Sequence, residues 1–109
     1  MNLEVYVLRD KVSGISNVIL TANNEKVLRR DIKGVLLGRD QNVINTNTED
    51  KDIYHIGDLN TETGVLTSLP NPVFLFNVET VRLELVKEIR AKKEQAGIIE
   101  ENQNDGTNN

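Results

Sequence analysis

Apolar and polar positions alternate along the first part of the chain with the period of two that is typical of β-strands. Residues 3–8 place Val5 and Val7 on one side and Tyr6 on the other. Because both sides are apolar, the pattern predicts a central strand. A second strand, antiparallel to the first, is expected over residues 15–21 after a polar connection.

The apolar spacing changes to that of a helix between residues 25 and 37. Leu28 and Ile32 belong to a repeat with intervals of four and three residues, which predicts one buried stripe. Asn24, the second of two adjacent asparagines, is a good N-cap, and Gly38 predicts a left-handed stop. A polar loop is expected to follow as far as residue 51, held down by apolar side chains at positions 43 and 44.

The stretch DIYHIGDLNTETGVLTSL, residues 52–69, predicts a β-hairpin. Its two strands are rich in β-branched and aromatic residues, and a turn over residues 60–64 separates them. Gly64 accepts the left-handed conformation that such a loop requires. Gly57 lies inside the first strand, where a glycine indicates a bulge or a close backbone approach.

The C-terminal part begins with two prolines in the segment PNP, which exclude a helix directly after the hairpin. The apolar run VFLF, residues 73–76, is either a fifth strand or a lead into the next helix. Asn77 or Thr80 caps a long predicted helix that continues to about residue 95, and Gly97 ends it.

Together these elements predict an α+β fold, in which a small antiparallel sheet of four to five strands packs against two helices. At 109 residues the chain is expected to form a single α+β domain over residues 1–97. Residues 98–109 form a flexible polar tail in this interpretation, because they are almost entirely acidic or amide side chains, glycine and threonine.

The composition restricts the class of protein. The net charge is −4, which argues mildly against a protein that works mainly on phosphate backbones. The chain has no cysteine, so disulfide and thiol chemistry are excluded. It also lacks a secretory signal pattern and an apolar run long enough to span a bilayer. We therefore expect a soluble, cytosolic protein without membrane contacts.

Motifs for catalysis or cofactor binding are absent from the sequence. Phosphate-binding glycine loops, nucleophile elbows and the HExxH zinc motif do not occur, and we expect no enzyme activity and no cofactor.

A metal site is also not expected. Asp58, Asn60 and Glu62 alternate like the start of a calcium loop, but Gly64 stands at loop position seven rather than six, and position twelve is not an acid. His55 is the only histidine, and without a second one or a cysteine it does not make a typical zinc site.

One basic patch stands out on the first predicted helix. It consists of Lys26, Arg29, Arg30 and Lys33. Such a stripe can follow a nucleic-acid backbone, and aromatic side chains can add a stacking platform for bases. The candidates for this platform are Tyr6, Tyr54, Phe74 and Phe76. An ordinary solvated helix face and a small aromatic core account for the same residues, and the residues alone favour that simpler interpretation.

Two segments of the chain together resemble a known family. The first is VYVLRDKVSG near the N-terminus, and the second is DIYHIGDLNTETG in the hairpin. The matching hairpin positions are Tyr54, Ile56, Gly57, Asp58, Asn60, Thr63 and Gly64. With the chain length and the polar tail, they make the sequence similar, over about residues 3 to 76, to the small non-structural proteins of gokushoviruses, single-stranded DNA phages of the Microviridae.

The resemblance implies a non-capsid protein that acts in the host bacterial cytoplasm and binds DNA while the single-stranded genome is produced or packaged. It implies no catalytic residues. Two hypotheses follow. In the first, the protein binds single-stranded DNA through phosphate contacts of the basic patch. In the second, it is an interaction module for phage or host replication and assembly proteins, without intrinsic DNA binding. The two apolar sides of the first strand also make a homodimer plausible.

Overall fold

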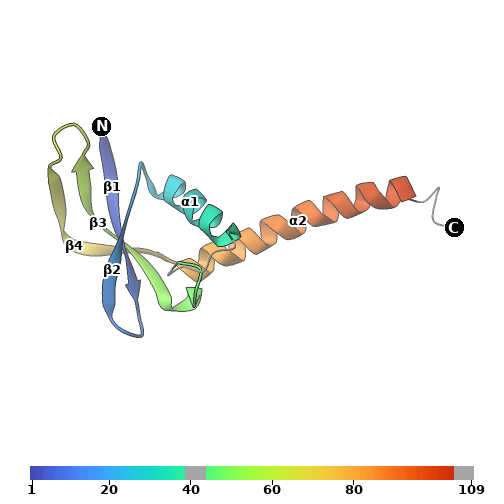
Figure 1. Ribbon diagram of the computed structural model, residues 1–109, viewed down its shortest axis with the longest axis horizontal. Coiled ribbons are helices and arrows are strands. Elements are labelled where there is room, and N and C mark those ends of the chain that lie inside the picture. The colour runs from blue at the N-terminus through green and yellow to red at the C-terminus, as the bar shows by residue number, and fades with distance from the viewer. Residues whose placement is uncertain (39–43, 105–109) are drawn as a thin grey trace.

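The computed structural model describes residues 1–38 and 44–104, with side chains up to residue 96 (Figure 1). Its elements in chain order are β1 (Asn2–Asp10), β2 (Ile15–Ala22), α1 (Glu25–Leu37), the short 3₁₀ helix η1 (Thr48–Asp50), β3 (Lys51–Asn60), β4 (Leu66–Asn77) and α2 (Val78–Asn104). The predicted α+β class is confirmed.

The four strands form one antiparallel sheet with the order β2-β1-β3-β4. β1 lies between β2 and β3, so its prediction as a central strand is confirmed. Leu8 faces Val18 on one neighbouring strand and Ile53 on the other, and these three side chains point to the same side of the sheet.

The hairpin is longer than the sequence predicts. β4 is a single strand that passes through Pro70 and Pro72 and includes the VFLF run, so the predicted fifth strand is the second half of β4. Within the described residues the sheet therefore has four strands. The prolines are tolerated because β4 lies at the edge of the sheet, where an outward-facing position needs no N–H donor. Register shifts after Ile53 and between His55 and Gly57 accommodate the bend of the hairpin.

Both glycine predictions in the hairpin are confirmed. Gly64 has a φ of +76° in the loop between β3 and β4. Gly57 lies against the backbone of the neighbouring strand, where a Cβ atom would come within 2.5 Å of the Thr67 carbonyl oxygen. The sequence needs glycine at position 57 because any side chain would separate the two strands.

The start of α1 agrees with the prediction from the sequence, but its end does not. Asn24 is the N-cap, and its side chain accepts a hydrogen bond of 2.9 Å from the Val27 N–H. The predicted left-handed stop at Gly38 is wrong, because this residue is extended, with φ −67° and ψ 154°. Its N–H donates to the Val35 carbonyl, so the helix closes with a tight last turn instead.

α2 begins where predicted but ends later. The Asn77 side chain accepts a hydrogen bond of 2.9 Å from the Glu79 N–H, which selects Asn77 over Thr80 as the cap. The helix continues past Gly97 to Asn104, about two turns further than the sequence predicts. Residues 105–109 of the predicted tail lie outside the described residues, as does the predicted contact of Val43.

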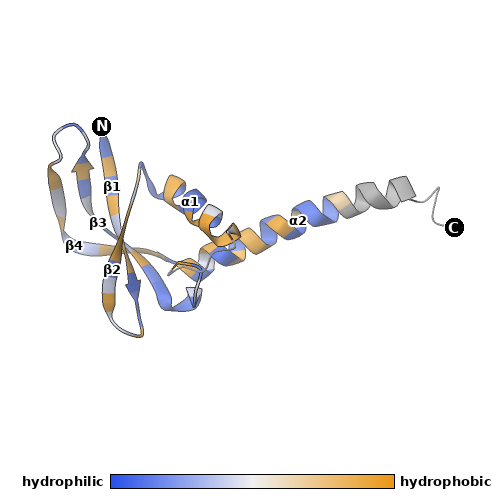
Figure 2. Cartoon of the chain, viewed as in Figure 1, coloured by the Kyte–Doolittle hydropathy of each residue, from blue (hydrophilic) through white to orange (hydrophobic). Residues whose placement is uncertain are grey.

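The core lies between one face of the sheet and the two helices. It consists of Tyr6, Leu8, Ala22, Leu28, Ile32, Ile44, Ile53, Phe76, Val78 and Val81. Ile44 is buried, which confirms that it holds the polar loop against the domain. α2 leaves this core after its first turns and projects away from the sheet (Figure 1), and Figure 2 shows that the coloured part of this projection is mostly hydrophilic. The chain therefore measures 66 × 34 × 22 Å.

Candidate nucleic-acid interface

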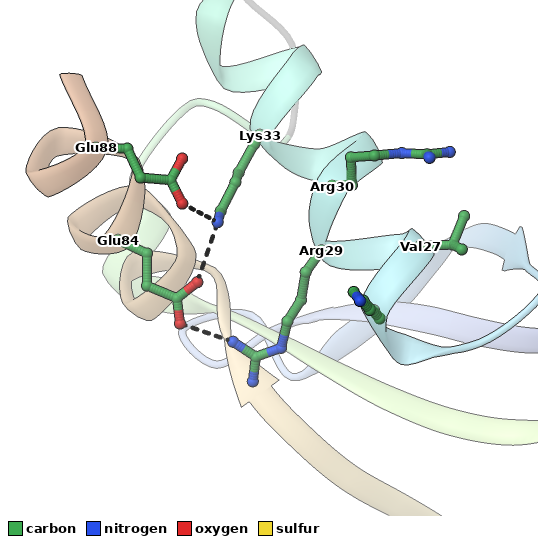
Figure 3. A pocket seen from close by; sticks show the side chains of 7 residues that line it. Val27, Arg29, Arg30, Lys33, Glu84 and Glu88 are labelled. Carbon is green, nitrogen blue, oxygen red and sulfur yellow. Dashed lines mark hydrogen bonds and ion pairs between the residues drawn. The ribbon is translucent and has the colours of Figure 1, made fainter. Parts of the chain in front are cut away.

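The four predicted basic residues lie together beside a hollow between α1 and α2 (Figure 3). This hollow has a volume of about 610 Å³ and is lined by Lys26, Val27, Arg29, Arg30, Lys33, Glu84 and Glu88. Two acidic side chains of α2 thus face the basic patch, and the residues of the patch differ in how far they are neutralised.

Arg29 serves as a structural link between the helices. Its Nε donates to Glu25 at 3.1 Å, and its Nη1 donates to Glu84 of α2 at 3.0 Å. The guanidinium also lies 4.3 Å from the centre of the buried Phe76 ring, a cation–π contact. Two carboxylates therefore already neutralise Arg29, and a phosphate would have to compete with them for its charge.

Lys33 makes a second link. Its Nζ lies 2.6 Å from Glu88 and 3.4 Å from Glu84. The hydrogen bond to Glu88 is the main reason why the pKa of the Lys33 ammonium is raised, and Glu84 adds to it, whereas partial burial opposes the rise. Lys33 is therefore a charged partner of α2 in this structure.

Lys26 and Arg30 are the outward-facing members of the patch. Arg30 extends away from α2 in Figure 3, and its side chain is 77% exposed, with one long contact of 3.6 Å to Asp31. Lys26 is exposed and forms no ion pair within residues 1–38 and 44–96. Of the four predicted residues, these two have side chains available to a ligand without loss of helix contacts.

The four candidate aromatic side chains divide between the two faces of the sheet. Tyr6 and Phe76 are buried in the core with exposures of 0% and 4%, so neither offers a surface for stacking. Burial and a hydrogen bond to Glu4 raise the pKa of the Tyr6 hydroxyl far above its usual value. Tyr54 and Phe74 lie on the opposite face, away from the helices, and Phe74 is 53% exposed.

An apolar row crosses this helix-free face, which we call the open face. Val7 is paired with Ile19 on one side and with Tyr54 on the other, and Tyr54 is paired with Phe74. The two rings meet edge to face with 5.6 Å between their centres. The alternation of β1 predicts an apolar second face, but the sequence did not show that one side chain from each strand would align there.

Arg9 lies at one end of the open face. Together with Val7, Ser16, Tyr54 and Pro72 it lines a shallow hollow of about 400 Å³. Its guanidinium lies over the turn between β1 and β2, near Gly14, and no carboxylate of the described residues forms an ion pair with it.

The residue paired with Arg9 on β3 is an acid, Asp52. Asp52 is 8% exposed and accepts a hydrogen bond of 2.8 Å from the Asn77 side chain. The accessible charge at this end of the open face is therefore that of the arginine.

One cluster of potential metal ligands was not predicted. Strand pairing brings Glu4 close to His55 and Asp58, with ligand atoms within 4.8 Å of one another. The His55 Nε2 is already within hydrogen-bond distance of the Gly57 carbonyl, at 2.9 Å, and of Asp58, at 3.3 Å. Glu4 accepts from Tyr6. Each of the three side chains therefore already has a hydrogen-bond partner within the protein.

Comparison with known proteins places the chain among phage proteins. Within the part of the chain that the structure describes, no helix is long and apolar enough to cross a membrane. No curated protein and no solved structure matches the sequence. A family model described as "Phage ORF5 protein" matches residues 3–81. Since that match spans β1 to the start of α2 and far more than half of the sequence, the chain belongs to the phage ORF5 family and is a bacteriophage protein.

Proposed function

We propose that this phage protein is a non-structural accessory protein that binds single-stranded DNA during genome replication or packaging, in the cytoplasm of its bacterial host. The resemblance to the gokushovirus proteins supports this role, and the assignment to that group is part of the proposal. The role is one of binding, without catalysis. The observation that carries it is the aromatic pair on the open face, in which Phe74 is exposed and Tyr54 is half-buried beside it.

Unpaired bases expose their ring faces, and each base that stacks on an aromatic side chain contributes about 1–3 kcal/mol. Phe74 is 53% exposed, and Tyr54 lies beside it on the neighbouring strand. Val7 and Ile19 extend the same row with apolar contact area across the sheet. A duplex hides its bases, so this face favours a single strand over a double one.

Phosphate contacts are proposed at two places. Arg9 lies at the end of the open face and reaches the hollow beside Tyr54. The predicted basic residues Lys26, Arg29, Arg30 and Lys33 lie on α1, which packs on the opposite face of the sheet. A strand on the open face would reach α1 only by passing around the edge of the sheet, so we expect Lys26 and Arg30 to make a secondary contribution.

The test is fluorescence anisotropy of labelled single-stranded and duplex DNA with the purified protein. Few cations face the open face, so the logarithm of the affinity should fall with the logarithm of salt with a slope of about −1 to −2, at about −0.7 for each neutralised phosphate. Phe74→Ala should weaken single-strand binding about 10-fold. Leu83→Ala is the matched control, because Leu83 is an exposed apolar side chain (49%) on α2 and not on the open face.

The second hypothesis, a protein-interaction module, is favoured by the net charge of −4 and by the ion pairs that occupy Arg29 and Lys33. It predicts no DNA binding at low salt with protein in large excess. In that case Phe74→Ala would reduce the capture of phage or host replication and assembly proteins instead.

A further variant separates the two proposed DNA surfaces. Lys26→Glu combined with Arg30→Glu leaves the open face unchanged and reverses only outward-facing charges of α1. If this change abolishes binding while Phe74→Ala does not affect it, α1 is the interface and the open face is not.

A further inference from the structure

β2 forms one outer edge of the sheet, and no described strand pairs with its outer side. The strand reads ISNVILTA, with neither a charged residue nor a proline. Exposed edge strands usually carry lysine, proline or a bulge, because these features prevent pairing with another chain. β2 lacks the first two along its whole length.

The opposite edge of the same sheet has such protection. β4 contains Pro70 and Pro72, and two register shifts interrupt its pairing with β3. In β2 the only irregularity lies near Asn17, where the register with β1 shifts. Residues 18–22 then continue in regular pairing with β1, which leaves an uncharged segment without a bulge at the edge.

We propose that residues 18–22 of β2 pair with the same segment of a second copy of this chain, antiparallel and across a two-fold axis. Pairing of identical strands brings identical side chains close together, so a charged strand would repel its own copy. A segment without charge has no such cost, and its β-branched residues suit a strand interface. This inference does not depend on the proposed DNA binding.

The open face adds contact area to this interface. Ile19 is 68% exposed, and it ends the apolar row of Val7, Tyr54 and Phe74 at the β2 edge. In the dimer, the rows of two copies would meet and form one continuous apolar face. A five-residue strand pair is small beside the roughly 1,200–2,000 Å² of stable interfaces, so we expect a concentration-dependent dimer.

Cysteine cross-linking tests the position of the contact, because the chain has no cysteine of its own. The combined change Ile19→Cys, Thr21→Cys places thiols opposite each other whether the two-fold axis passes residue 19, 20 or 21. Leu66→Cys with Ser68→Cys is the matched control, at the same spacing on the exposed edge strand β4. Mild oxidation should give a covalent dimer with the first pair and not with the second. Equal cross-linking of both pairs, or none of the first, would overturn the proposal.

Light scattering after size exclusion, without DNA, tests the assembly itself. The mass should rise with concentration from 12.3 kDa towards twice that value. Ile19→Lys with Thr21→Lys should keep the protein monomeric, because like charges would then face each other, and both positions are exposed, so the fold should tolerate the change. A dimer that persists in this variant would contradict the proposal. So would a monomeric mass at about 1 mM of the unmodified protein, where even millimolar affinity populates a dimer.

Discussion

Arg29 and Arg30 are neighbours on α1, but the structure predicts a loss of stability only when Arg29 is replaced by alanine. Arg29 joins Glu84 of α2 and lies over the buried Phe76 ring, whereas Arg30 is 77% exposed with one distant partner. Both variants replace an arginine by an alanine within α1. The change in intrinsic helix propensity is therefore the same and cancels when the two are compared. The comparison therefore measures the tertiary contacts of Arg29.

The magnitude follows from those contacts. The Arg29 side chain is 26% exposed, and its carboxylate partners are 43% and 42% exposed, so each ion pair is screened and contributes about 0.3–1 kcal/mol. The cation–π contact with Phe76 adds about 0.5–2 kcal/mol. We expect Arg29→Ala to lower the free energy of unfolding by about 2 kcal/mol, and Arg30→Ala to change it by less than about 0.5 kcal/mol.

Urea denaturation followed by circular dichroism measures both values, with an unchanged slope as the sign that the unfolded states are comparable. High salt should reduce the effect of Arg29→Ala, since part of it comes from exposed ion pairs. If the two variants unfold within about 0.5 kcal/mol of each other at low salt, the structural role assigned to Arg29 is refuted. Arg29 would then be as free as Arg30 to bind phosphate.

Three further changes test other parts of the fold by the same assay. Gly57→Ala should destabilise by about 2 kcal/mol or more, because its Cβ would meet a backbone oxygen at 2.5 Å, whereas Gly34→Ala, with open space around it, should stabilise by up to about 1 kcal/mol. Asn24→Ala should cost about 1 kcal/mol through the lost cap of α1. A hydrogen bond from Arg82, and a smaller contribution from one donated by Thr48, hold the pKa of Glu79 at about 2, below its ordinary 4.5. Its stabilisation is therefore full above pH 4.5 and disappears as the pH falls towards 2, and Glu79→Gln should flatten this part of the stability profile. An equally steep acid transition in the Gln variant would contradict that assignment.

The sequence predicted the features that depend on neighbouring residues. The Asn24 cap, the left-handed Gly64 and the alternation of β1 are local, because a few adjacent side chains and one turn of backbone determine them. The class of the fold and the central position of β1 follow from the same local patterns. The close approach at Gly57 was predictable as well, since a glycine between β-branched and aromatic strand residues weakens the strand unless the backbone geometry requires it.

What the sequence could not predict depends on contacts between distant segments. Nothing near Arg29 in the sequence indicates Glu84, which lies 55 positions away on another helix. The pattern i, i+4, i+7 is the same for a phosphate-binding stripe and for a face that pairs with acids of a second helix. Likewise, the alternation of each strand assigns residues to two faces, but only the register of all four strands aligns Val7 with Tyr54 and Phe74.

Under the proposed function, the two faces of the sheet account for how an acidic protein can hold a nucleic acid without a basic groove. The helices cover one face, where Arg29 and Lys33 are matched by acids and serve the fold. The other face has an aromatic pair and Arg9, whose pairing partner Asp52 is buried and accepts a hydrogen bond from Asn77. On such a surface, base stacking supplies most of the affinity and charge supplies little. A shallow salt dependence is therefore the property that distinguishes this arrangement from a phosphate-tracking stripe on α1.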